Sequence, residues 1–245
     1  MNSMTQWPFA KYWGECWNPI VGCRPCSPAC DNCYAREMMV NRFKRSFDPH
    51  ESTKKKPPEG GVVFCGNMTD LFGEWVLPGT ALQYILSAAY SLEDTTYLWL
   101  TKRPSRMVGV LHFLPPGCLE LGCMSSHFFG FTAENQACYD MRIRDWRADA
   151  PAWANGWLSA EPLLGRIDLG LRYVAPEDQP FKWVVVGCES GPRRRPCKIE
   201  WVEWIVEECL AAGVPVFVKQ LDLNGRCETN IDKFPKLLRI RQVPW

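Results

Sequence analysis

Short apolar runs alternate with helix-like stretches between Gly61 and Gln220. The runs rich in β-branched and aromatic residues predict strands at 62–65, 97–100, 128–131, 157–158, 183–186 and 214–218, with a seventh near 17–21. Apolar residues at helical spacing predict helices over 81–90 and 200–212, the second ending at Gly213, and a third helix is expected after Cys33. This alternation predicts βα units around a parallel sheet, and the length of 245 residues fits a single barrel-sized domain.

A compact polar cluster follows most of the predicted strands. The clusters are Asn67, Thr69 and Asp70; Thr101, Lys102 and Arg103; Thr132, Glu134 and Asn135; Ser159 and Glu161; Glu189 and Ser190; and Lys219 and Gln220. In a parallel barrel all carboxyl ends of the strands open on one face, so we expect these clusters to converge on one site. The alternative is that polar residues merely mark loops.

Composition and charge set limits on the function. Apolar residues make up 47% and charged residues 22%, the balance of an ordinary globular chain. A net charge of +1 gives no global attraction to nucleic acid, so any such contact must come from a local cluster such as Arg193, Arg194 and Arg195, which otherwise forms a solvated loop. No apolar run approaches bilayer length and residues 1–10 lack a signal-peptide pattern, which predicts a cytoplasmic protein without a membrane partner.

Four of the thirteen cysteines lie in one loop, residues 17–34. Cys23, Cys26, Cys30 and Cys33 have the spacing C-x2-C-x3-C-x2-C. In a cytosolic chain disulfides are rare, so clustered thiols indicate metal or redox chemistry. The dispersed cysteines are expected to pack as small apolar residues.

Three metal assignments compete for this loop. Zinc would use all four thiolates, although zinc sites usually separate two C-x2-C pairs by a longer insert. A ferredoxin-like carrier would also use four, but in the order C-x2-C-x2-C-x3-C. Cys26, Cys30 and Cys33 form C-x3-C-x2-C, the spacing typical of radical S-adenosylmethionine enzymes, whose three-cysteine 4Fe-4S cluster leaves one iron open for the cofactor.

Several further motifs carry a family resemblance over nearly the whole chain. They are Trp17-Asn18-Pro19 with Gly22-Cys23, Cys30-Asp31-Asn32-Cys33-Tyr34, Met68-Thr69-Asp70-Leu71-Phe72, Leu100-Thr101-Lys102-Arg103-Pro104, Ala133-Glu134-Asn135-Gln136, Leu158-Ser159-Ala160-Glu161-Pro162, Gly187-Cys188-Glu189-Ser190-Gly191 and Phe217-Val218-Lys219-Gln220. With these motifs the chain resembles the phage-encoded three-cysteine-motif family, which is related to radical S-adenosylmethionine enzymes.

The resemblance implies a ligand set, a fold and a substrate class. The family pattern C-x6-C-x2-C maps onto Cys23, Cys30 and Cys33 and usually lacks a cysteine at position 26, so this sequence offers two first ligands, Cys23 and Cys26. The implied fold is an incomplete TIM-like (β/α) barrel over residues 1–245, with the cluster at its mouth and a C-terminal extension from about residue 221. The implied activity is rearrangement of a thymine-derived base in phage DNA, in the host cytoplasm, with an external electron donor.

Roles for the polar residues follow from this implied barrel. Asn67, Thr69 and Asp70 are expected at the amino group of S-adenosylmethionine, although Asp70 is also a candidate helix cap. Lys102, like Arg103, suits the cofactor carboxylate or a DNA phosphate, with a surface salt bridge as the alternative for Arg103. Tyr34 is expected to pack on the cluster loop. The remaining mouth residues would hold cofactor or substrate, with Glu134, Glu161 and Lys219 as proton carriers beside Asn135, Ser159 and Glu189.

Two other functions remain open. One is a zinc-stabilised nucleic-acid-binding module without catalysis, and the other is a radical enzyme that acts on RNA or a free nucleotide. If DNA is the substrate, a base must be flipped out while Arg193, Arg194 and Arg195 meet phosphates.

Overall fold

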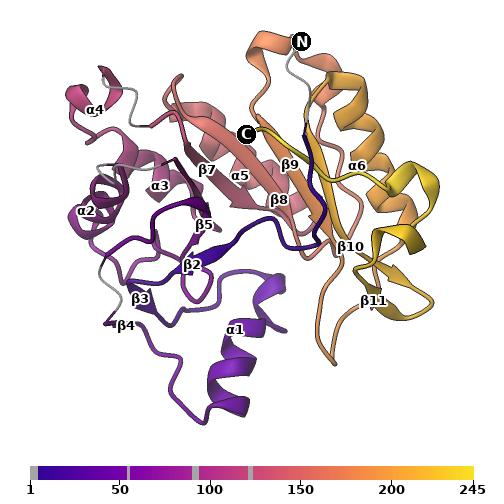
Figure 1. Cartoon of the computed structure of the whole chain (residues 1–245), viewed down its shortest axis with the longest axis horizontal. Helices are drawn as coiled ribbons and strands as arrows, with labels where there is room; N and C mark the ends of the chain where they lie inside the picture. The colour runs from indigo at the N-terminus through magenta and orange to yellow at the C-terminus, as the bar shows by residue number, and fades with distance from the viewer. Residues whose placement is uncertain (1–4, 54–55, 90–93, 121–123) are drawn as a thin grey trace. The chain divides into compact units, whose positions relative to one another are not determined.

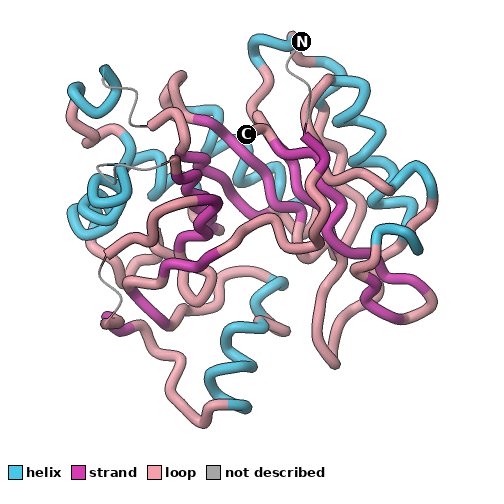
Figure 2. Tube along the Cα trace, viewed as in Figure 1, coloured by secondary structure: helices cyan, strands magenta, loops and turns pink. Residues whose placement is uncertain are grey.

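The computed structural model describes residues 5–53, 56–89, 94–120 and 124–245 (Figure 1). The chain divides into two compact units. The cysteine-loop unit comprises residues 13–131 and 142–155, and the C-terminal unit comprises the segment up to residue 12 together with 132–141 and 156–245. Strands alternate with helices along the trace (Figure 2).

The cysteine-loop unit is built on four parallel strands in chain order. β2 (Glu15–Trp17) pairs with β5 (Gly61–Cys65), β5 with β6 (Thr95–Thr101), and β6 with β7 (His127–Thr132). Between these strands lie α2 (Pro78–Ala89), α3 (Pro104–Leu111) and α4 (Pro116–Glu120), and α2 packs against α3. The strands predicted at 62–65, 97–100 and 128–131 are confirmed. Helix α2 begins three residues before the predicted start, and Tyr90 lies outside the described residues.

An aromatic stack fills the core beside β6 and β7. Strand residues two apart point to the same face, so Trp99 lies opposite Phe129 and beside His127, with the rings stacked about 6 Å apart. The Trp99 indole N–H donates to Nδ1 of His127 at 3.0 Å. All three side chains are buried, and this stack fixes the register of two strands.

The predicted strand at 17–21 is two short strands instead. β2 ends at Trp17, and β3 (Ile20–Val21) pairs with β4 (His50–Glu51) in an antiparallel ladder. Pro19 between them has no N–H to donate, which breaks the ladder. The helix expected after Cys33 is confirmed as α1 (Tyr34–Glu37), which continues into a π-helical turn over Met38–Arg42.

The C-terminal unit repeats the parallel pattern. β8 (Asn155–Ala160) pairs with β9 (Trp183–Gly187) and β9 with β10 (Val216–Leu223), all parallel, while β11 (Arg226–Glu228) pairs with β10 in the antiparallel sense. Helix α5 (Gln136–Asp149), whose residues from Arg142 onward belong to the cysteine-loop unit, precedes β8, and α6 (Ile199–Ala212) joins β9 to β10. Gly213 ends α6 with φ +69°, as predicted. The short elements are β1 (Thr5–Gln6), β12 (Gln242–Val243), which pairs with β1, and 3-10 turns at Pro28–Cys30, Leu171–Tyr173, Pro176–Asp178, Ile231–Lys233 and Lys236–Leu238.

The last predicted strand is shifted towards the C-terminus. The N–H of Val214 donates to the carbonyl of Cys209 at the end of α6, and Pro215 has no N–H, so the strand starts at Val216. It runs on to Leu223 because Gln220 still pairs with Gly187 of β9 and residues 221–223 pair with β11. Lys219 and Gln220 therefore lie inside a strand, not in the loop that was predicted to follow it.

Parallel strands separated by helices confirm the α/β class. The strand order within each unit follows the chain, which is the connectivity expected of successive βα units. Closure of the strands into an incomplete barrel stays a prediction. Among the described residues, no helix is long and apolar enough to cross a membrane.

Candidate functional site

The four cysteines of the loop are free thiols held in a folded turn. Cys26 is exposed, and Cys23, Cys30 and Cys33 are half-buried. The Cys33 N–H donates to the Cys30 carbonyl at 3.3 Å, and both Cys23 and Cys33 pack against a small apolar cluster made of Ala35, Met39 and Phe47. Two of the predicted ligands are thus seated on the first helix after the loop.

The surroundings give these thiols different proton affinities. Burial raises the pKa of Cys23 to about 12, with Asp70 as the next cause. The hydrogen bond between Cys26 and Cys30 lowers the pKa of Cys30 to about 4, and it raises that of Cys26 well above its usual range. The contact thus favours the thiolate form of Cys30 and the protonated form of Cys26, and burial favours the protonated form of Cys23.

Glycine and threonine fix the start of the loop. The Gly22 N–H donates to the Met68 carbonyl at 3.0 Å, and the Thr69 hydroxyl donates to the Gly22 carbonyl at 2.6 Å. Gly22 has φ +96°, and a Cβ there would lie 2.4 Å from the carbonyl oxygen of Asp48, so only glycine fits. Thr69, predicted to bind the cofactor, thus also holds the segment that presents Cys23.

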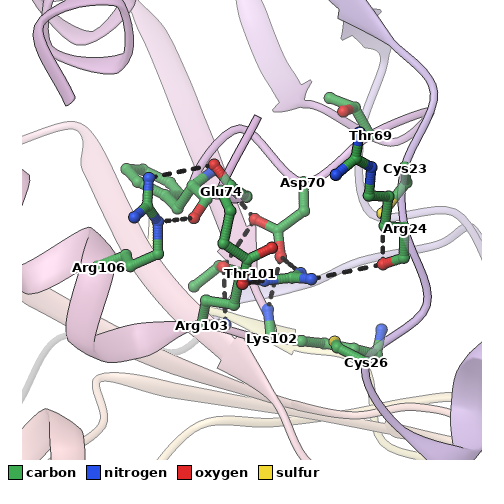
Figure 3. Close-up of polar contacts among 12 residues, drawn as sticks. Cys23, Arg24, Cys26, Thr69, Asp70, Glu74, Thr101, Lys102, Arg103 and Arg106 are labelled. Atoms are coloured by element: carbon green, nitrogen blue, oxygen red, sulfur yellow. Dashed lines mark hydrogen bonds and ion pairs between the residues drawn. The ribbon is translucent and has the colours of Figure 1, made fainter. Parts of the chain in front are cut away.

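The carboxylate of Asp70 is surrounded by donors (Figure 3). Oδ1 accepts from the Phe72 N–H at 3.0 Å and the Thr101 hydroxyl at 2.7 Å. Oδ2 accepts from the Lys102 N–H at 3.1 Å and the Arg103 guanidinium at 3.0 Å. These four donors match the capacity of a carboxylate, so Asp70 ties together the loops that follow β5 and β6. It caps no helix, because α2 begins at Pro78.

Arg103 connects that carboxylate to the cysteine loop. Its Nε donates to Glu74 at 2.9 Å and its Nη2 to the Arg24 carbonyl at 3.4 Å, next to Cys23 (Figure 3). The guanidinium also lies 4.9 Å from the Trp75 ring centre. The alternative for this arginine was a surface salt bridge; the structure shows a buried ion pair with Asp70 together with a contact to the exposed Glu74. The positive charge of Lys102 helps to lower the pKa of Cys30, so this side chain acts on the loop directly.

Asn67 and Tyr34 close the loop from the other end. The Asn67 side chain accepts from Asn18 Nδ2 at 2.7 Å, and its backbone carbonyl accepts from the Tyr34 hydroxyl at 2.5 Å. Tyr34 is 51% exposed, so it anchors the loop through its hydroxyl and does not bury its ring, contrary to the packing that was predicted. The role of Asn18 was missed, although the Trp17-Asn18-Pro19 motif marks it.

The donor set suits a soft metal or an iron-sulfur cluster. Among the described residues, no group of three or more His, Cys, Asp or Glu side chains is arranged so that it could hold a metal ion. Sulfur ligands are nevertheless the type that iron-sulfur clusters and structural zinc take, and the pKa of one of the four, Cys30, is lowered. Cys30, Cys33 and either Cys23 or Cys26 therefore fit such a group in the chemistry of their donor atoms.

A second polar group lies in the C-terminal unit. Lys219 Nζ is 2.9 Å from Glu161 Oε1, and both Ser159 and Tyr12 donate to Glu161 Oε2 at 3.3 Å. A Cβ on Gly187 would lie 3.2 Å from Glu161 Oε1, so the small residue on β9 leaves room for this carboxylate. The structure thus brings together three residues predicted for the site: Ser159, Glu161 and Lys219.

The other predicted residues of this unit have structural contacts. Glu134 is fully buried, and its backbone carbonyl accepts from the Leu164 N–H at 2.7 Å. The Asn135 side chain accepts from the Cys138 N–H at 3.0 Å and so caps α5. The Glu189 side chain is 4% exposed, and its carboxylate accepts hydrogen bonds from the backbone N–H and the guanidinium of Arg195. Glu134 is therefore hydrogen-bonded through its backbone, and Asn135 and Glu189 through their side chains.

Carboxylates face two of the three consecutive arginines. Arg195 pairs with Glu189, and Arg194 Nη2 lies 3.9 Å from Asp222 Oδ1, while Arg193 is exposed. Contact of all three with DNA phosphates stays a prediction, with much of the charge already balanced within the fold.

Comparison with known proteins gives one match. A family model described as "Protein of unknown function (DUF5131)" matches residues 10–233. Neither the curated proteins nor the solved structures contain a match to the chain. Since the family model spans more than half of the sequence and both polar groups described above, the chain belongs to the family of that description, DUF5131.

Proposed function

We propose that the protein is a radical S-adenosylmethionine enzyme with a 4Fe-4S cluster in the loop 23–33. The observation that carries the proposal is the seating of Cys23 and Cys33 on one apolar cluster, with Cys30 between them in sequence. The cysteine spacing and the resemblance in sequence support it. The match to a family of unknown function is neutral towards it.

The ligands in this proposal are Cys30, Cys33 and Cys23, with Cys26 as the competing first ligand. Cluster and S-adenosylmethionine together supply a 5′-deoxyadenosyl radical that removes a substrate hydrogen. Thr69, Asp70 and Arg103 hold the backbone of Gly22 and Arg24 and so position Cys23. Lys102 adds a positive charge near Cys30 and suits the carboxylate of the cofactor.

The substrate in this proposal is a thymine-derived base in phage DNA, whose substituent is rearranged. Glu161 and Lys219 form an acid–base pair that suits proton transfer to or from such a substituent. Lys219 is 24% exposed, so a ligand can reach its amine, whereas Glu161 is 11% exposed and is held by Ser159 and Tyr12. Lys219, Ser159 and Tyr12 all contact the Glu161 carboxylate, so its orientation is fixed.

Anaerobic reconstitution tests the class of enzyme. We expect a brown protein with about four irons per chain that releases 5′-deoxyadenosine after reduction with dithionite and addition of S-adenosylmethionine. Cys30→Ala and Cys33→Ala should abolish both properties, while Cys138→Ala, a half-buried thiol outside the loop, is the matched control. Single replacements of Cys23 and Cys26 identify the third ligand. Colourless protein with one zinc per chain would instead support the zinc-stabilised module.

Comparison of substrates tests the finer proposal. The reconstituted enzyme is offered phage DNA with the modified base, RNA of the same sequence, and the free nucleoside. Release of 5′-deoxyadenosine that depends on the DNA supports the proposal, and stimulation by RNA or by the free nucleoside alone contradicts it.

A further inference from the structure

The chain that follows the last cysteine is amphipathic. We define the basic segment as residues 34–47, which contain α1 and its π-helical turn (Figure 1). Its buried side chains, Ala35, Met39 and Phe47, pack with Cys23 and Cys33. Residues 40–46 are all exposed. One side of the segment therefore supports the cysteine loop and the other faces solvent.

Cations and aromatic rings are interspersed along the segment, with Arg36 turned towards the cysteine loop, where its guanidinium donates to the Cys23 carbonyl at 3.5 Å. The basic segment contains one acidic side chain, Glu37, and four basic ones, for a local net charge of +3 in a chain whose total is +1: Arg36, Arg42, Lys44 and Arg45. Tyr34 and Phe43 are 51% and 50% exposed. Positive groups interspersed with exposed rings are the pattern of surfaces that bind nucleic-acid strands, in which cations meet phosphates and rings stack on bases.

Lys44 occupies a position where glycine is the usual residue. Its φ is +52°, in the left-handed region, and it ends the π-helical turn, where the Arg45 N–H donates to the Met39 carbonyl at 2.9 Å. Helices commonly end in this conformation with glycine, because a Cβ is disfavoured there. The chain thus places a cation at an unfavourable backbone position, which stability alone does not explain.

We propose that the basic segment is the DNA-docking surface of this protein, with phosphates on Arg42, Lys44 and Arg45 and unpaired bases on Tyr34 and Phe43. This inference rests on the proposed function and names the surface on which the proposed enzyme would bind its DNA substrate. The consecutive arginines at 193–195 fit the role less well, because Glu189 and Asp222 face two of them. The basic segment has one carboxylate for four cations, and that carboxylate accepts from Asn41 at 2.6 Å.

The location also suits the substrate. The buried side of the segment shares an apolar cluster with Cys23 and Cys33, so DNA bound on the exposed side lies on the same segment that supports the cysteine loop. A base flipped from the bound strand would then be near the proposed cluster.

Binding of a fluorescein-labelled single-stranded oligodeoxynucleotide tests the surface, measured by anisotropy on the iron-loaded full chain from about 50 to about 200 mM salt. Lys44→Gly removes a charge and relaxes the backbone. We expect it to raise the melting temperature while it weakens binding severalfold and lowers the salt slope by about 0.7. The triple variant R42A/K44G/R45A should lower the slope by about two. Phe43→Ala should weaken binding about fivefold or more with an unchanged slope.

A matched triple variant removes three exposed cations of the C-terminal unit: Lys182→Ala, Arg226→Ala and Lys236→Ala. Unchanged binding by this control, with weaker binding by the basic-segment variants, supports the assignment. Equal losses in both triple variants, an unaltered slope in R42A/K44G/R45A, or tighter binding of RNA of the same sequence overturns it. Failure of the proposed enzyme class is seen separately, as missing iron and no 5′-deoxyadenosine in a wild-type protein that still binds DNA.

Discussion

The Asp70 carboxylate lies 3.0 Å from the Arg103 guanidinium, and the two side chains are only 8% and 10% exposed. They come from loops after neighbouring parallel strands, β5 and β6, whose carboxyl ends meet at one edge of the sheet. Through the Arg24 carbonyl, Arg103 extends this pair to the residue after Cys23. The position of one candidate ligand is therefore set by a buried ion pair in two other loops.

Loss of Asp70 should weaken both the fold and the cysteine loop. Asp70→Ala removes the acceptor of four donors and leaves Arg103 with the exposed Glu74, so we expect the free energy of unfolding to fall by about 3 kcal/mol or more. Iron content after reconstitution should fall with it. Glu74→Ala is the control, because its carboxylate is 61% exposed and should contribute less than about 1 kcal/mol. Urea unfolding and iron analysis give the readouts, and a destabilised Asp70→Ala protein with full iron content would contradict the anchoring role.

His127 should make the protein sensitive to acid. Burial lowers its pKa to about 3, from an ordinary 6.5, so between these values the unfolded chain binds a proton that the folded chain does not. The stabilisation is complete above pH 6.5 and is lost as the pH falls towards 3, by about 2 kcal/mol between pH 7.5 and pH 5.

The variant His127→Gln separates this effect from general acid unfolding. Glutamine offers an acceptor for the Trp99 indole but takes up no proton, so its free energy of unfolding should fall about 2 kcal/mol less than that of wild type over the same pH range. Urea titrations at both pH values measure the difference. Parallel losses in the two proteins would show that His127 does not cause the acid sensitivity.

The sequence predicted the strands well because their interiors are continuous apolar runs, such as Trp183 to Val186, bounded by polar residues. It failed where a pairing partner decides the ends: β10 continues past Val218 because Gln220 pairs with Gly187 of β9 after a register shift, and residues 221–223 then pair with β11. The cysteine loop was evident from spacing. The hydrogen bonds of Asp70 and Arg103 that hold this loop were not evident, because their partners lie about thirty residues away along the chain. The pairing of Arg195 with Glu189 was hidden in the same way, since sequence shows a run of charges but not its counter-charges.

Among the cysteines outside the loop that the structure describes, Cys227 should be the most reactive thiol near neutral pH. A hydrogen bond from Cys188, whose sulfur is 3.8 Å away, is the main cause that lowers the pKa of Cys227 to about 7, and the charges of Arg194 and Lys219 contribute to the same shift. We expect alkylation by iodoacetamide, followed by peptide mass spectrometry, to show a rate that rises with pH around an inflection near 7. Cys188→Ala should raise that pKa and slow labelling at pH 7 about tenfold, because each unit of pKa is a factor of ten in thiolate. Cys138→Ala, which leaves the pair intact, should leave the rate unaltered, and an unaltered rate in Cys188→Ala would contradict the hydrogen bond as the cause.

Variants of the Glu161–Lys219 ion pair can show whether the pair acts in catalysis or only stabilises the fold. Each of the variants Glu161→Gln and Lys219→Met breaks the 2.9 Å contact and leaves a partly buried charge without its counter-ion, so each should lose stability. The double variant removes both charges and should recover much of that loss. If the pair moves protons on the substrate, as proposed, product formation should fall by about 10² to 10⁴ in all three proteins, while iron content stays at the wild-type level. Tyr12→Phe, which removes only the 3.3 Å contact to Glu161, should cost less than about tenfold. Recovery of product formation together with stability in the double variant would show that the pair serves the fold alone.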